Sequence, residues 1–309
     1  MFAPDLTAQH VEGKKITLEQ RALGAYLGLA VGDALGATTE FLTPREIREK
    51  FGVHSRICGG GWLHLKSGQV TDDTEMSLVL GQSIIENGGV KEKAVAEAFS
   101  QWMRGKPVDI GNTVRRGIVH YRNSGETSVP ENEFDAGNGA CMRSLPVAIA
   151  YWNAGWDELV AVSRIQSHIT HHNRQADAGT EALLQMLRLA FSSASKQALF
   201  DIANGLVDNH RVYRFDRRQV ENPSGWIVET LQAVFQSFFN NDDFESVLVD
   251  VVNRGGDADT TGAIAGMLAG AFYGVDAIPG YWLKALNKDV KAACHGQTLA
   301  LLKLADMSG

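Results

Sequence analysis

The chain has 309 residues, of which 44% are hydrophobic and 21% charged, and its formal net charge at pH 7 is -7. These proportions are those of a globular protein and exclude a disordered or fibrous chain. The acidic balance, with no block of lysine and arginine, argues against a nucleic-acid partner. Cys58, Cys141 and Cys294 form no C-x-x-C pair, so we expect free thiols and a cytoplasmic protein.

Neither end of the sequence nor its apolar stretches predict a membrane protein. The N-terminus, MFAPDLTAQHVEGKK, is too polar for a signal peptide. The two most apolar stretches, 23–37 and 263–275, are shorter than the roughly 20 residues that a membrane span needs.

Apolar residues recur every three to four positions along most of the chain, which predicts helices. In chain order, the predicted helices cover roughly 19–41, 75–87, 91–103, 112–122, 139–153, 156–167, 177–192, 197–209, 224–239, 243–252, 260–273 and 280–303. Strictly alternating runs rich in Val, Ile and Thr are nearly absent, so the predicted class is all-α. We expect one compact multi-helix domain at 19–305, preceded by an N-terminal extension at 1–18.

Two of the predicted helices carry a glycine at every fourth position. The two sets are Gly24, Gly28, Gly32 and Gly36, and Gly262, Gly266, Gly270 and Gly274. Each glycine inside a helix costs up to about 1 kcal/mol relative to alanine, so close approach of two backbones is the expected gain. Antiparallel packing of the two helices would place Glu40 beside Asp257 and Asp259. The alternative is tight core packing with no bearing on chemistry.

Two acidic clusters, TDDTE at 71–75 and DADTT at 257–261, each precede a predicted helix. The structural alternative is helix capping, with Asp72 as the cap and Glu75 completing a capping box. Each cluster, however, holds more oxygen ligands than a cap uses. The candidate ligands are Thr71, Asp72, Asp73, Asp257, Asp259 and Thr260.

Gathered carboxylates repel one another unless a cation neutralises them. Hard oxygen ligands select Mg²⁺, Mn²⁺ or Ca²⁺ over zinc or copper. Aspartates shared between two ions hold them roughly 3.5–4 Å apart. The two clusters therefore predict a dinuclear, oxygen-ligated metal site.

Three further segments carry polar candidates. In DAGNGACMR, the turn Gly137–Asn138–Gly139 can present backbone N–H groups to phosphate at a helix N-terminus, or can be an ordinary helix entry. In PVDIGNT, Asp109 and Asn112 are candidate site residues; the alternative is that they only stabilise a turn and cap a helix. SHITHHN lacks a recognised zinc spacing, so one histidine facing a substrate is favoured over a zinc site.

Taken together, these segments resemble the ADP-ribosylglycohydrolase family. The segments that carry the resemblance are GLAVGDALGATTEF, GQVTDDTEMS, PVDIGNT, DAGNGACMRSLP, RIQSHITH and NRGGDADTTGAIAGMLAGAFYG. Their order and separation match the family over roughly 20–285. GGGWLHLKSGQVTDDTEMSL and the run 107–118 resemble, more narrowly, the branch of the family that reactivates dinitrogenase reductase.

The resemblance implies an all-α fold with a cleft that holds two divalent cations, Mn²⁺ first and Mg²⁺ as the alternative. It makes the six candidates of the acidic clusters metal ligands and places Glu40 in the water shell of the metals. It implies that the Gly137–Asn138–Gly139 loop binds the diphosphate or the adjoining ribose, and that Asp109 and His171 lie over the scissile ribose. Trp226 is expected to stack on the substrate.

The implied reaction is hydrolysis of the N-glycosidic bond between ADP-ribose and an arginine side chain, with Asp109 or Glu40 as the acid/base. The implied protein substrate is the nitrogenase iron protein, with a PII-type signal protein as a regulator that recruits the enzyme to a membrane transporter. The alternatives are another ADP-ribosylated protein, a small conjugate, or an inactive relative that binds ADP-ribose or is structural. Loss of metal aspartates would mark an inactive relative, and all of them are present.

Two positions depart from the branch pattern. The branch continues THNHP after the first histidine, whereas this chain reads THHNR. Trp226 precedes IVET where the branch has a tyrosine before an IVDT-like run. The indole keeps a ring for stacking but lacks the phenol hydroxyl.

Overall fold

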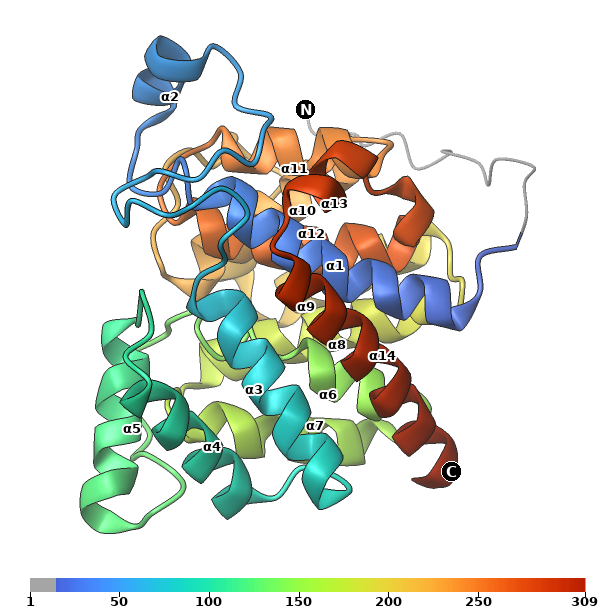
Figure 1. The fold of residues 1–309 in the computed structure, drawn as a ribbon. Helices are drawn as coiled ribbons and strands as arrows, with labels where there is room; N and C mark the ends of the chain where they lie inside the picture. The colour runs from blue at the N-terminus through green and yellow to red at the C-terminus, as the bar shows by residue number, and fades with distance from the viewer. Residues whose placement is uncertain (1–14, 309) are drawn as a thin grey trace.

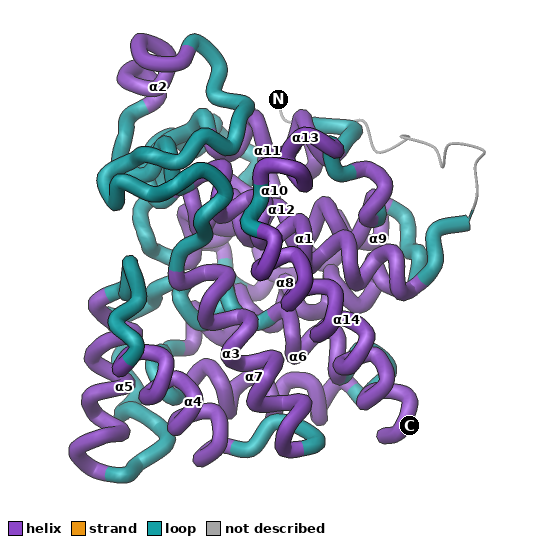
Figure 2. Tube along the Cα trace, viewed as in Figure 1, coloured by secondary structure: helices purple, strands orange, loops and turns teal. Residues whose placement is uncertain are grey.

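The computed structural model describes residues 15–308, and within that range it contains helices, turns and loops but no β-strand (Figures 1 and 2). The predicted all-α class is confirmed. Most of the predicted N-terminal extension lies outside the described residues, and the domain limits at 19–305 stay a prediction.

The helices, in chain order, are α1 (Leu18–Gly36), α2 (Pro44–Phe51), α3 (Asp72–Asn87), α4 (Glu92–Arg104), α5 (Asn112–Ser124), α6 (Leu145–Ala150), α7 (Trp156–His168), α8 (Arg174–Phe191), α9 (Lys196–Asn209), α10 (Ile227–Asn240), α11 (Phe244–Val252), α12 (Ala258–Tyr273), α13 (Gly280–Ala285) and α14 (Lys288–Ser308). Two short 3₁₀ helices, η1 (Arg211–Tyr213) and η2 (Val275–Ala277), complete the set. Among the described residues, no helix combines the length and the apolar composition of a membrane span.

Helices α1 and α12 form the centre of the fold. Every residue of α12 from Ala258 to Ala271 is buried, and so is nearly every residue of α1 from Arg21 to Gly36. Helices that are apolar on all sides are core helices, and the other helices pack around this pair (Figure 1). The amphipathic helices α4, α5, α8 and α10 supply outer layers whose apolar faces point inward.

The glycine faces of α1 and α12 meet directly and antiparallel. A Cβ atom built on Gly32 would lie 1.9 Å from the carbonyl oxygen of Gly262, and one on Gly28 would lie 2.2 Å from that of Gly266. No side chain fits in these gaps, because real Cβ atoms do not approach backbone atoms so closely. The predicted close approach of the two helices is therefore confirmed, and its direction is antiparallel.

The prediction missed α2, although its sequence carries a helix start. The Thr43 side chain accepts a hydrogen bond from the Glu46 N–H, the Glu46 carboxylate accepts one from the Thr43 N–H, and Pro44 occupies the first turn. The capping box and the N-terminal proline are local signals of a helix start. The prediction missed them because α2 is short and mostly polar, with Ile47 as its one buried residue.

Three predicted helices are wrong in extent. The helix expected at 19–41 ends at Gly36, so Glu40 lies in the turn that follows it. The helix expected at 139–153 is a turn followed by the short α6, because Pro146 suits only a first turn and Arg143 is drawn into the interior. The Arg143 guanidinium donates to the Gln166 carbonyl and to the Thr170 hydroxyl, each at 2.8 Å. The helix expected at 280–303 is divided into α13 and α14, since Asn287 accepts from two following N–H groups and restarts the helix.

We expect Gly32→Ala to lower the free energy of unfolding by at least about 2 kcal/mol, because the methyl group overlaps the α12 backbone. Gly205→Ala in α9 is the matched control. A Cβ atom there meets nothing within 4 Å, so alanine should raise the free energy of unfolding by up to about 1 kcal/mol. Urea denaturation measures both values. Equal effects of the two substitutions would contradict the close-contact explanation.

Candidate metal centre and active-site cleft

A cleft of about 660 Å³ opens where the C-terminal end of α1, the N-terminal ends of α3, α5 and α12, and the loop before α6 meet. Most of the predicted site residues line it. They are Glu40, Asp72, Asp109, Asn112, Gly137, Asn138, Gly139, His171, Asp257, Asp259 and Thr260. The structure therefore brings together segments that lie as much as 220 positions apart in the chain (Glu40 and Thr260).

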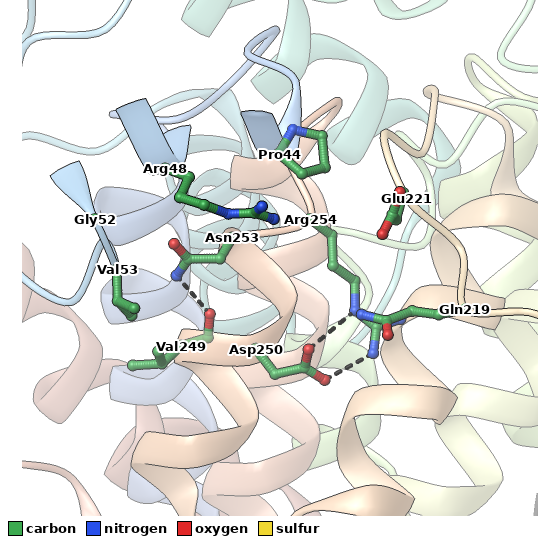
Figure 3. A pocket seen from close by; sticks show the side chains of 10 residues that line it. All are labelled: Pro44, Arg48, Gly52, Val53, Gln219, Glu221, Val249, Asp250, Asn253 and Arg254. Atoms are coloured by element: carbon green, nitrogen blue, oxygen red, sulfur yellow. Dashed lines mark hydrogen bonds and ion pairs between the residues drawn. The ribbon is translucent and has the colours of Figure 1, made fainter. Parts of the chain in front are cut away.

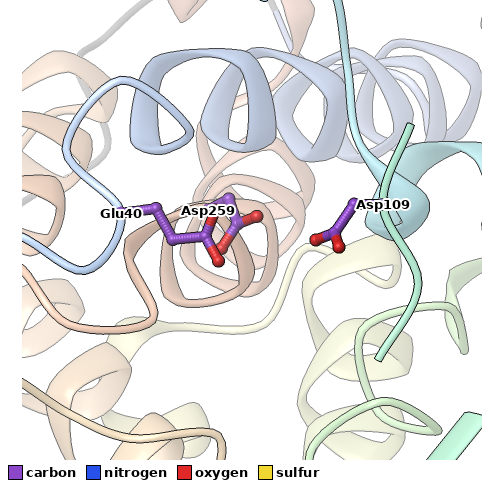
Figure 4. Close-up of side chains that lie close together, drawn as sticks. All are labelled: Glu40, Asp109 and Asp259. Carbon is purple, nitrogen blue, oxygen red and sulfur yellow. The ribbon is translucent and has the colours of Figure 1, made fainter. Parts of the chain in front are cut away.

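Three carboxylates converge inside the cleft (Figure 4). Glu40 follows α1, Asp259 lies in the first turn of α12, and Asp109 lies in the loop before α5. One oxygen of each lies within 4.8 Å of the others, close enough to share a cation. The predicted approach of Glu40 to Asp259 is confirmed, and it follows directly from the antiparallel contact of the two glycine-rich helices.

A second group of oxygens lies beneath them and is buried. The Thr71 hydroxyl lies 3.4 Å from the Asp259 carboxylate, and the Thr260 hydroxyl lies 3.3 Å from the Asp73 carboxylate. The second oxygen of Asp73, Oδ1, is buried without a hydrogen-bond partner. Since an unsatisfied buried carboxylate oxygen is costly, this donor set fits a bound cation.

Side-chain capping, the structural alternative, is absent at the N-caps of both acidic clusters. Neither Thr71, the N-cap of α3, nor Asp257, the N-cap of α12, makes a side-chain cap hydrogen bond. Asp33 of α1 caps α3 instead, because its carboxylate accepts hydrogen bonds from the N–H groups of Thr71 and Thr74 at 3.1 Å. The cluster carboxylates are thus left for other partners.

Asp33 is a positioning residue that the sequence analysis missed as part of the site. It is fully buried and also accepts hydrogen bonds from the hydroxyls of Thr71 and Thr74. Its signal in the sequence is a single acid in the middle of an otherwise apolar run. An acid in such a place needs donors, and the threonines of the acidic cluster supply them.

Burial dominates the electrostatics of the cluster. Burial, reinforced by neighbouring carboxylates, raises the pKa of Glu40 and that of Asp72 to about 8. The pKa values of Asp73 and Asp259 are raised well above the usual range for the same two reasons. Within residues 15–308, no lysine, arginine or histidine side chain forms an ion pair with this cluster.

The Gly137–Asn138–Gly139 loop forms one wall of the cleft and is backed by His171. A Cβ atom on Gly139 would lie 2.8 Å from the imidazole ring, so glycine lets the loop pack directly on the histidine. Burial, with Arg143 and Arg116 nearby, lowers the pKa of His171 to about 3. His171 is therefore a neutral support that faces the cleft.

Asn138 anchors this loop. Its N–H donates to the Gly225 carbonyl at 3.0 Å, and its side-chain amide donates to the carboxylate of Asp257 at 2.5 Å and to the hydroxyl of Thr230 at 2.9 Å. The loop is not at a helix N-terminus as expected, because α6 begins only at Leu145. The helix dipole therefore adds nothing to anion binding there.

Two predicted substrate contacts lie at the edge of the cleft. Asn112 is the exposed first residue of α5, whose N-cap, Gly111, donates its N–H to Asp72. The Trp226 side chain is not among the groups that line the cleft. It bridges to Gly137 through its backbone, and its indole N–H donates to Gln175 at 3.3 Å.

The histidines of SHITHHN separate. His168 and His172 stack with ring centroids 3.9 Å apart, and the His168 ring is hydrogen-bonded to Asp177. His171 alone turns into the cleft. Among the described residues, the group placed to share a metal contains carboxylates and no histidine, in line with the expectation of one substrate-facing histidine.

A second hollow, of about 290 Å³, lies between α2 and α11 (Figure 3). Its buried cation, Arg254, pairs with Asp250 at 2.7 Å and donates to Gln236 at 2.8 Å. The guanidinium is thus already neutralised, and this hollow has none of the convergent carboxylates of the cleft.

The raised pKa values generate a prediction about pH. Carboxyl groups with a raised pKa hold protons that the unfolded chain releases above about pH 4, so the folded state loses stability as the pH rises toward about 8. The chelator-treated protein should therefore melt at a temperature at least about 3 °C lower at pH 8 than at pH 5.5.

Calorimetry with and without a divalent cation checks this. The cation should raise the melting temperature more at the higher pH, and Asp72→Asn should flatten the pH dependence of the metal-free protein. Rising stability of the metal-free protein over this range would contradict the assignment of the cluster as uncompensated carboxylates.

Comparisons with known proteins identify a family of glycohydrolases that this chain matches along most of its length. Residues 14–308 match the family model of ADP-ribosylglycohydrolase. The chain is 47% identical to the ADP-ribosyl-[dinitrogen reductase] glycohydrolase of Rhodospirillum rubrum, over 94% of this chain and 98% of that protein. It is 33% identical to the ADP-ribosylarginine hydrolase Tri1 of Serratia proteamaculans, over 86% of this chain and 75% of that one.

A solved structure described as an ADP-ribosylglycohydrolase-related protein complex superposes with a TM-score of 0.83 at 37% identity. The match covers 93% of this chain and 99% of the other. Sequence, fold and the acidic cluster lead to one conclusion: this chain belongs to the ADP-ribosylglycohydrolase family.

Proposed function

We propose that this protein hydrolyses the N-glycosidic bond between ADP-ribose and an arginine side chain of a protein. The observation that carries the proposal is the cluster of oxygen ligands from the starts of α3 and α12, with Glu40 and Asp109, in a cleft large enough for a dinucleotide-sized ligand. The relatives named as hydrolases of ADP-ribosylarginine and of ADP-ribosyl-[dinitrogen reductase] support it.

The proposed ligands of two divalent cations are Thr71, Asp72, Asp73, Asp257, Asp259 and Thr260. The first cation we propose is Mn²⁺, with Mg²⁺ as the alternative, because the set consists of hard oxygen donors. Two bound cations supply Lewis-acid polarisation of ribose hydroxyls and a template that orients the sugar. In this proposal Asp33 of α1 orients Thr71 through hydrogen bonds, and the first turn of α12 contributes Asp259 and Thr260.

The walls of the cleft hold the rest of the substrate in this proposal. Gly137 and Gly139 leave bare backbone that the diphosphate can approach, while Asn138 ties the loop to Asp257. Neutral His171 supports that loop without adding charge. Asn112 and Trp226 border the cleft and are proposed as outer substrate contacts.

Glu40 and Asp109 are the two candidates for the acid/base. As the glycosidic bond breaks, the acid gives its proton to the leaving arginine nitrogen, and the base accepts a proton from the water that attacks the anomeric carbon. Both carboxylates lie within the same group of oxygens as Asp259, so both are within reach of one reacting carbon. Glu40 accepts a hydrogen bond from the Trp62 indole at 2.6 Å, which fixes the orientation of its carboxylate.

The proposed protein substrate is dinitrogen reductase, the nitrogenase iron protein, because the Rhodospirillum rubrum relative is named for that substrate. We place the enzyme in the cytoplasm with its iron-protein substrate. A PII-type regulator that recruits it to a membrane stays a prediction from family resemblance. Another ADP-ribosylated protein is the second candidate, favoured by the relatives named only as ADP-ribosylarginine hydrolases.

The test is release of ADP-ribose from arginine-modified iron protein, with Mn²⁺, with a chelator, and with Asp259→Asn. We expect release that depends on the cation and falls more than about 100-fold in the variant, because a ligand is lost. Calorimetric titration with Mn²⁺ gives a second readout, and the variant should bind less of the cation.

The matched control is Asp201→Asn, which changes an exposed carboxylate of α9 away from the cleft and should leave both readouts unchanged. Release from free ADP-ribosylarginine but not from iron protein would transfer the proposal to another protein substrate. Binding of ADP-ribose without any hydrolysis would overturn it in favour of an inactive relative.

A further inference from the structure

Two exposed aromatic rings stand on the rim of the cleft. Phe41 is 63% exposed and Trp62 is 49% exposed, and both line the same cavity as the carboxylates. Their ring centroids lie 5.4 Å apart, and the ring planes are inclined at 54°. Large apolar rings left in contact with solvent beside a polar cleft mark a binding surface.

The backbone holds Phe41 in an unfavourable conformation. Its φ angle is 60°, in the left-handed region that bulky residues avoid. The Phe41 N–H donates to the Gly256 carbonyl at 2.7 Å, which ties the residue to the loop that leads into α12. Strain of this kind persists where the surrounding structure imposes it, and it concentrates at functional sites.

Trp62 is brought to the same place by a loop of three glycines. Gly59, Gly60 and Gly61 all have positive φ angles, and a Cβ atom on Gly61 would lie 2.2 Å from the Ala37 carbonyl oxygen. The loop therefore packs against the segment that carries Glu40. The Trp62 indole N–H donates to the Glu40 carboxylate at 2.6 Å.

One carboxylate thus has an aromatic ring beside it in sequence and a second aromatic ring hydrogen-bonded to it. Because an oxygen of Glu40 lies close to oxygens of Asp109 and Asp259, the aromatic pair stands next to the carboxylates that are proposed to cleave the bond. A phosphate is disfavoured so close to three carboxylates, because like charges repel. The neighbour of the scissile bond on this side is the leaving group, which is a planar cation.

Guanidinium groups stack on aromatic faces and pair with carboxylates. We propose that Phe41, Trp62 and Glu40 form the subsite for the guanidinium of the ADP-ribosylated arginine, and that the two rings set the preference for a cationic leaving group. This inference rests on the proposed function. The inference adds to the proposed function by assigning substrate specificity to residues outside the metal-ligand set.

The test compares ADP-ribosylarginine with its citrulline analogue, in which the guanidinium becomes a neutral urea of the same shape. Phe41→Gly removes one ring and suits the left-handed backbone, and Trp62→Leu removes the other. Each variant should weaken binding of the arginine conjugate by about three- to thirtyfold and leave that of the citrulline analogue and of ADP-ribose within about twofold. Competition assays measure all three constants.

Trp62→Phe separates the ring from the hydrogen bond to Glu40. It should retain the preference for arginine over citrulline while changing turnover of both conjugates, because only the orientation of Glu40 is altered. Trp156→Ala, which removes an exposed indole at the start of α7, is the matched control and should change none of these constants.

Equal losses for arginine, citrulline and ADP-ribose would overturn the inference and make the pair a general support of the cleft. A loss confined to intact modified protein, with free ADP-ribosylarginine bound normally, would overturn it in favour of a docking surface for polypeptide. The proposed function fails separately: in that case the unaltered enzyme releases ADP-ribose from no conjugate, whereas binding of the three ligands is still measurable.

Discussion

The site depends on one contact, the approach of α1 to α12 through bare backbone. Glycine at every fourth position weakens both helices as isolated segments, and it is tolerated because it lets their backbones touch. The antiparallel direction of that contact brings the end of α1 to the beginning of α12. Glu40 and Asp259 meet as a consequence, so the packing of the core and the position of the chemistry have the same cause.

Within this frame, carboxylates of one chemical type take different roles because their surroundings differ. Asp33 receives hydrogen bonds from two backbone N–H groups and two hydroxyls, and it serves as the cap of α3. Asp73 lies nearby with one oxygen that has no donor. Because Asp33 caps α3, the acids at the start of α3 are not needed as caps. Their carboxylates repel one another, and a bound cation would relieve that repulsion.

The walls of the cleft obtain their shape from backbone that few residues can adopt. Gly139 packs against the His171 ring, and Gly61 packs against the carbonyl of Ala37. Phe41 takes a left-handed conformation without being glycine, which turns its ring out onto the rim. The rigid floor carries the charge, and the constrained walls determine which groups can stand beside it.

The sequence by itself determined the helical class, the close approach of the two glycine-rich helices and the oxygen character of the candidate metal site, because local periodicity and residue chemistry encode these properties. It also placed most of the residues that line the cleft. Other features required the tertiary structure. The cap from Asp33, the tie from Asn138 to Asp257 and the pairing of Trp62 with Glu40 each join residues that are distant in the sequence. The local sequence around each residue does not indicate its partner, because only the packing of the helices brings the two within hydrogen-bond distance.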